Sequence, residues 1–153
     1  MGVPATVLVQ HEDFDVGAEV ARLKSASGDV GAIVTFSGVC RSDDGRLESL
    51  ELEHYPGMAE GEIGRIVEEA SGRWPLAGVT VIHRFGRIPA GDNIVLVATA
   101  SRHRQAAFEA ASFLMDFMKN RAPFWKKEHP SDAREGGWVA AKESDDSAAK
   151  RWR

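Results

Sequence analysis

The 153-residue sequence contains one cysteine, Cys40, and this scarcity limits the kinds of site that the chain can build. A single thiol cannot form a disulfide within one chain, and it cannot supply a metal site made of several thiolates. One cysteine is also typical of proteins in a reducing compartment. Cys40 itself has two interpretations: a reactive thiol whose pKa is lowered beside Arg41, or a buried thiol without a chemical role.

Long apolar runs and a secretion signal are also missing. No apolar run approaches the roughly 20 residues that a helix needs to cross a bilayer, and residues 1–6 lack the basic start and apolar core of a signal peptide. Apolar residues make up 43% of the sequence and charged residues 27%, as in ordinary soluble proteins. We therefore expect one soluble, cytoplasmic domain over residues 1–153, with no membrane contact.

The sequence has no excess of positive charge. Its 19 Lys and Arg residues face 23 Asp and Glu residues, a formal net charge of −4. Proteins that bind nucleic acid through its phosphates usually carry a basic domain, so we expect no nucleic-acid partner. The five histidines follow no metal-binding spacing, and glycine-rich nucleotide loops and nucleophile elbows are absent from the sequence, so we expect no metal and no cofactor.

Local patterns predict a mixed α+β domain. Strand patterns, marked by β-branched residues, alternation or apolar runs, occur at 6–9, 31–39, 50–54, 79–83 and 94–98, with helical patterns at 15–24 and 58–71. The turn signal at 42–45 favours a hairpin between 31–39 and 50–54. A second hairpin is expected between 124–128 and 138–141, followed by a short helix over 144–151.

The central stretch of the chain is Ser101–Glu128. A long helix is predicted from about His103–Arg104 to about residue 122, because Pro123 ends the pattern. Its apolar stripe is expected to contain Ala107, Phe108, Ala110, Ala111, Leu114, Met115 and Met118. Basic residues gather at both ends of this stretch, a composition that favours an anion site.

Both ends of this helix offer cations to an anion. His103 and Arg104 stand at its start, where free backbone N–H groups already favour negative charge. Lys119 stands in its last turn, and Lys126 follows just beyond. At about 1.5 Å per residue, Arg104 and Lys119 lie roughly 22 Å apart along one helix. If both ends serve one small ligand, two copies of the chain must meet there.

Each candidate also has an ordinary interpretation. Arg41 follows an apolar strand, where side chains often reach into pockets, but a solvated turn arginine fits the same pattern. His103, Arg104, Lys119 and Lys126 are equally compatible with an ordinary surface. The aromatic and cationic neighbours of the two lysines favour a lowered lysine pKa, suited to proton exchange or attack on a carbonyl.

Six segments together resemble one family. They are Val34–Gly38, Leu52–Met58, Val81–Arg84, His103–Arg104, Phe108–Ala110 and Lys119–Glu128. The chain resembles the large, catalytic subunit of molybdopterin synthase, the MoaE family, from about Val7 to Trp152.

The resemblance implies a fold and a reaction. The fold would be a mixed α/β hammerhead-type domain that forms a homodimer within a heterotetramer. Each copy would bind a small ubiquitin-like sulfur-carrier subunit, whose C-terminal Gly-Gly thiocarboxylate enters the active site. The reaction would convert cyclic pyranopterin monophosphate to molybdopterin by transfer of two sulfurs.

The resemblance also assigns site residues. Lys119 and Lys126 would be the catalytic lysines, and the substrate-binding residues would be Val39, Cys40, Arg41, His103, Arg104, Lys119, Lys126, Lys127 and Glu128. Lys142 stands where the family often has an arginine. Two alternatives remain: a module that binds a ubiquitin-like tail or an anionic metabolite without catalysis, and a sulfurtransferase that works through Cys40.

Overall fold

The computed structural model describes residues 3–121, 123–131, 137–139 and 152. Over these residues the chain forms β1 (Ala5–Gln10), α1 (Val16–Ser25), β2 (Ala32–Val39), β3 (Leu47–His54), α2 (Met58–Arg73), β4 (Leu76–Arg84), β5 (Gly86–Pro89), β6 (Asn93–Ser101), α3 (Arg104–Arg121), β7 (Phe124–Pro130) and β8 (Gly137–Val139). The expected α+β class, with mainly antiparallel strands and a long helix in the C-terminal half, is confirmed. The expected helix over 144–151 and Lys142 lie outside the described residues.

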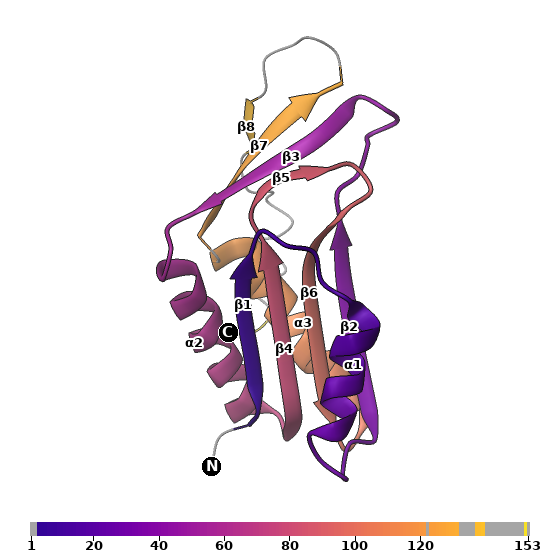
Figure 1. Ribbon diagram of the computed structural model, residues 1–153. Helices are drawn as coiled ribbons and strands as arrows, with labels where there is room; N and C mark the ends of the chain where they lie inside the picture. The colour runs from indigo at the N-terminus through magenta and orange to yellow at the C-terminus, as the bar shows by residue number, and fades with distance from the viewer. Residues whose placement is uncertain (1–2, 122, 132–136, 140–151, 153) are drawn as a thin grey trace.

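The first sheet has the order β1-β4-β6-β2, with β1 parallel to β4 and the other pairs antiparallel. Helices α2 and α3 pack on one face of this sheet, and α1 packs on the other (Figure 1). β6 has neighbours on both edges and helices on both faces. It is accordingly buried from Val95 to Ser101, as its continuous apolar run predicts.

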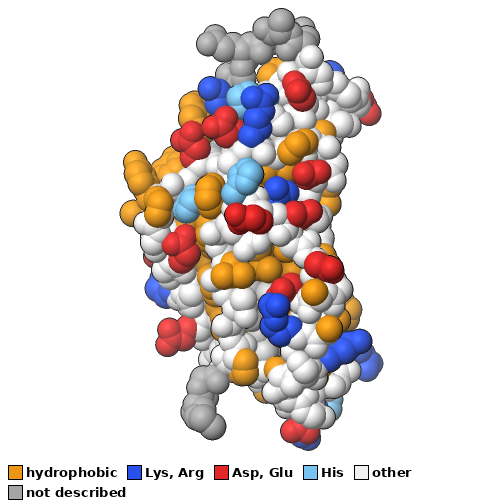
Figure 2. Space-filling model, in the orientation of Figure 1, with side chains coloured by type: hydrophobic (Ala, Val, Ile, Leu, Met, Phe, Trp, Pro, Cys, Tyr) orange, Lys and Arg blue, Asp and Glu red, His pale blue; other side chains and the backbone are white. Residues whose placement is uncertain are grey.

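The second sheet has the order β5-β3-β7-β8, is antiparallel throughout, and crosses one end of the first sheet (Figure 1; the same view is space-filling in Figure 2). Pairing of β7 with β8 confirms the second expected hairpin over its described part. The first expected hairpin is wrong, because β2 pairs with β6 while β3 pairs with β5 and β7. The turn signal instead marks a loop that leads from one sheet to the other, in which Asp43 and Asp44 adopt the left-handed backbone conformation.

Helix α3 matches the predicted range and ends just before Pro123. Most of the expected stripe packs inward, together with Phe113 and Phe117. Phe108 is the exception: its side chain is 61% exposed, so its placement in the core was wrong. At 100° per residue, Phe108 lies well to one side of the buried stripe, on the flank that also carries Met115 and Lys119.

Candidate active site

Lys119 and Lys126 line one small cavity, of about 110 Å³, at the junction of the two sheets. The end of α3 supplies Lys119, which is exposed, and the start of β7 supplies Lys126, which is half-buried. Val39 and Met115 contribute apolar wall. The structure therefore brings the two predicted catalytic lysines together within one chain.

Strand alternation decides which residues of β7 reach this cavity. Lys126 lies opposite Leu52, which is buried, so its side chain starts from the inner face of the second sheet. Glu128 lies on the same inner face, two residues further along. Lys127 points to the opposite face, across from Glu51. Lys127 is thus a predicted substrate-binding residue that the structure does not bring to the cavity.

His83, at the end of β4, also lines the cavity and was missing from the predicted site. Its ring stacks on Phe124 with centroids 3.8 Å apart, and its Nδ1 lies 2.8 Å from the carbonyl oxygen of Arg84. The pKa of His83 is lowered to about 4, mainly by burial and then by the charges of Lys126 and Lys119, against the opposing effect of the Arg84 hydrogen bond. The imidazole is therefore neutral near neutral pH. The sequence signal that could have identified His83 is a histidine at the end of a buried strand.

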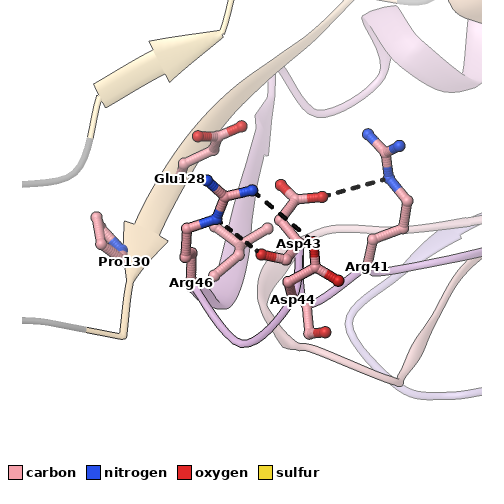
Figure 3. A pocket seen from close by; sticks show the side chains of 8 residues that line it. Arg41, Asp43, Asp44, Arg46, Glu128 and Pro130 are labelled. Carbon is pink, nitrogen blue, oxygen red and sulfur yellow. Dashed lines mark hydrogen bonds and ion pairs between the residues drawn. The ribbon is translucent and has the colours of Figure 1, made fainter.

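Arg41 lines a second, open pocket of about 630 Å³, shown in Figure 3. Its side chain is 74% exposed, and its Nε lies 3.8 Å from an oxygen of Asp43. Glu128 lines the same pocket (Figure 3). Because Glu128 and Lys126 lie two residues apart on one face of β7, roughly 7 Å, the pocket and the lysine cavity are neighbours.

Cys40 lies between Val39 and Arg41 but faces the protein core. It is 1% exposed and packs with Leu47, Leu52 and Ile88. Burial raises the pKa of the Cys40 thiol, which agrees with the interpretation of a buried thiol and not with that of a reactive thiol whose pKa is lowered. The arginine next to it points away, into the open pocket.

His103 and Arg104 line a third hollow, of about 700 Å³, at the opposite end of α3. Exposed Phe108 borders the same hollow. The helix separates Arg104 from Lys119 by roughly 22 Å along its axis. The structure therefore does not bring these two predicted site residues to the lysine cavity within one chain.

Two features are absent from the described part of the chain. No group of three or more His, Cys, Asp and Glu side chains there is arranged to hold a metal ion. No helix there is both long and apolar enough to cross a bilayer.

Comparison with known proteins gives a consistent result. Residues 9–121 match the family described as MoaE protein. A molybdopterin synthase catalytic subunit from Mesorhizobium japonicum is 67% identical over 148 residues, covering 97% of this chain and 93% of the relative. One from Escherichia coli is 49% identical, covering 95% and 97%. The solved MoaE protein from Burkholderia ambifaria superposes with a TM-score of 0.83 at 44% identity, covering 97% of each chain.

The family match extends from β1 through α3 and so includes Lys119, His83 and both ends of the long helix. The relatives cover the remainder, including β7 with Lys126. Sequence, fold and length agree over nearly the whole chain, which belongs to the MoaE family.

Proposed function

We propose that this chain is the catalytic subunit of a molybdopterin synthase. It would convert cyclic pyranopterin monophosphate to molybdopterin with sulfur from the thiocarboxylated C-terminus of a small carrier subunit. The observation that carries this proposal is the cavity shared by Lys119 and Lys126. Among the described residues that line it there is no Asp or Glu, so its net charge favours an anion.

The size of the cavity favours the end of a peptide tail. A volume of about 110 Å³ corresponds to roughly four water molecules. That space suits a Gly-Gly terminus, which has no side chains, and is too small for a pterin with its phosphate. The neighbouring pocket with Arg41 has about 630 Å³ and a guanidinium suited to paired contacts with phosphate.

The proposed roles follow from these positions. Lys119 would engage the terminal carbonyl of the donor, where an ammonium stabilises the negative charge that forms on oxygen when water adds to the carbonyl carbon; the carbon–sulfur bond then breaks, leaving the sulfur on the pterin and a carboxylate on the carrier. Lys126 stands on the side toward Glu128 and Arg41, and would hold the pterin together with Arg41. The substrate phosphate and the thiocarboxylate are both anions, which suits the two lysines of the cavity, whereas the pocket of Arg41 is also lined by Asp43, Asp44 and Glu128.

The remaining predicted residues point to a homodimer. Phe108, Met115 and Lys119 share one flank of α3, and β2 forms the adjacent edge of the first sheet. Phe36 on β2 is 40% exposed, and its register partner Val97 lies under α3. Two copies paired antiparallel along this flank would bring Arg104 of one copy to Lys119 of the other. His103 and Arg104 would then complete the partner's site.

Product formation tests the proposed function. The purified chain is mixed with cyclic pyranopterin monophosphate and a thiocarboxylated carrier, and the pterin is analysed by mass spectrometry. We expect a product with two added sulfurs, and none when the carrier ends in an ordinary carboxylate. A chain that binds the carrier tail but yields no dithiolene would instead be the non-catalytic binding module.

A further inference from the structure

His83 is the feature of the cavity that the proposed roles leave unexplained. Its Nδ1 lies 2.8 Å from the carbonyl oxygen of Arg84. A carbonyl oxygen can only accept a hydrogen bond, so Nδ1 carries the proton. The neutral ring then has its lone pair on Nε2, at the opposite edge.

The ring is held on two sides. Phe124 stacks on its face with an interplanar angle of 13°. Arg84 is itself fixed, since its Nε donates to the carbonyl of His11 at 3.0 Å and its Nη1 donates to the carbonyl of Asn93 at 2.9 Å. Both the tautomer and the direction of Nε2 are therefore set by the surrounding fold.

The second ring nitrogen of His83, Nε2, lacks a donor among the described residues. Within the described part of the chain, no protein group donates a hydrogen bond to it. In the same part of the chain, no side-chain nitrogen or oxygen is both fully buried and without a hydrogen-bond partner. Nε2 is therefore not fully buried, and we infer that it faces the cavity that His83 lines together with the two lysines.

The charged and titratable groups near His83 come from three elements. Lys126 on β7 has the larger electrostatic effect on the pKa of His83, followed by Lys119 on α3 and His54 on β3. Lys126 also lies two residues from Phe124 on the same face of β7, the face on which the imidazole stacks. Of the two lysines, Lys126 is thus the better placed to reach Nε2.

Resting on the proposed function, we propose that His83 is a positioning residue of this site: its Nε2, which has no donor in the described structure, accepts a hydrogen bond from the ammonium group of Lys126 when that side chain turns toward the ring, and so directs that group toward the substrate. A carboxylate would accept the same bond but would cancel the positive charge that an anionic substrate requires. A neutral imidazole orients the lysine and leaves the charge in place.

The hydrogen bond is tested without any assay of activity. NMR of isotopically labelled imidazole nitrogens in the full chain is expected to show the neutral tautomer protonated at Nδ1 between about pH 5 and about pH 8. Lys126→Met should shift the Nε2 resonance, and the matched variant Lys119→Met should shift it less. The proposal would be overturned if Lys126→Met left the chemical shift of Nε2 unchanged, or if the neutral ring carried its proton on Nε2.

Two substitutions then test the role in turnover. His83→Asn keeps a donor near Nδ1 for the Arg84 carbonyl but removes the Nε2 acceptor, whereas His83→Gln places an amide oxygen near Nε2. We expect His83→Asn to lower kcat by about tenfold to hundredfold, the range for one hydrogen bond to a charged group, with little change in KM for the carrier. His83→Gln should recover part of kcat.

If His83→Asn has the same kcat as the wild type, the positioning role is contradicted. If His83→Asn and His83→Gln lose kcat equally, the side chain serves packing alone. Circular dichroism and the thermal midpoint check that each variant is folded. If the wild-type chain forms no dithiolene at all, the proposed function fails, and the NMR comparison still decides whether the His83–Lys126 bond exists.

Discussion

The two ends of α3 carry cations in very different settings. At the C-terminal end, Lys119 stands at a cavity of about 110 Å³ whose walls come from β2, β4, β6, α3 and β7. At the N-terminal end, His103 and Arg104 border an open hollow of about 700 Å³ beside exposed Phe108. The C-terminal end of α3 thus lines a cavity enclosed by the same chain, whereas the N-terminal end lies on an open surface.

The difference indicates where each end acquires its function. A preorganised cavity orients its charges before the ligand arrives, and a water-poor setting strengthens their effect on that ligand. Cations on an open surface are screened by water and salt and contribute little alone. The N-terminal end of α3 therefore gains most if a second surface covers it, as the proposed homodimer would.

Removal of Lys119 should have the largest effect. Lys119→Ala is expected to lower dithiolene formation by at least about a hundredfold, because the charge lost faces the reacting group in a confined site. Lys119 is exposed, so the thermal midpoint should change little. Single-turnover product formation measures the loss, with Lys24→Ala on α1 as the control for removal of an exposed lysine. Retained turnover would remove Lys119 from the chemistry.

Mixed dimers test whether the two ends of α3 meet across the pair. Lys119→Ala and Arg104→Ala are each expected to be nearly inactive alone. Random pairing makes about half of the dimers mixed, and each mixed dimer has one intact site of two, so the mixture should recover about a quarter of wild-type activity. Activity after co-refolding, with native mass spectrometry to count mixed dimers, gives the answer.

The matched control combines Lys119→Ala with Lys126→Ala. Both lysines line one cavity of one chain, so their mixed dimer contains no intact site and should recover nothing. If the mixture of Lys119→Ala and Arg104→Ala recovers no more activity than this control, although mixed dimers are confirmed, Arg104 does not contribute to the site of the partner copy. An active Arg104→Ala parent would show that the N-terminal end of α3 is dispensable.

Local patterns predicted the elements better than their partners. The 3.6-residue period and Pro123 set α3 within a residue or two, and alternation located β3. The pairing of β2 with β6 could not be read from the sequence, because strand pairing depends on contacts far apart in the chain. A turn pattern predicts that the chain changes direction, but it does not predict which sheet the next strand joins.

The site was predicted unevenly for the same reason. Lys119 and Lys126 stood out because they are close in sequence, and the structure places both in one cavity. His83 comes from β4, 36 residues before Lys119, and only the fold brings it to that wall. The position of Phe108 was wrong because an apolar residue at one edge of a helical stripe fits the period while facing water.

His83 should make the C-terminal cavity sensitive to acid. Its pKa is about 4 in the folded protein against 6.5 for an unperturbed imidazole, so between these values the unfolded chain binds more protons. The free energy of unfolding should therefore fall by up to about 3 kcal/mol as pH drops from about 6.5 to about 4. Denaturant unfolding at several pH values measures this fall in the wild type.

The same titration in His83→Gln should lose most of that contribution, since an amide does not titrate. His103→Gln, which removes an exposed imidazole at the open end of α3, is the control and should keep most of the wild-type pH dependence. If wild type and His83→Gln lose stability in parallel, the buried neutral histidine is not the source of the acid sensitivity.

Cys40 should show the smallest effect on turnover, although Val39 and Arg41 on either side of it line the two neighbouring pockets. Its thiol is 1% exposed and burial raises its pKa, so it is neither accessible nor ionised near neutral pH. Cys40→Ala is expected to leave product formation within about twofold of wild type while lowering the free energy of unfolding by roughly 1 kcal/mol, the cost of a small void. Loss of sulfur transfer in a variant that remains folded would instead favour the sulfurtransferase that works through Cys40, because the lysines and the arginine would then all be in place and still insufficient.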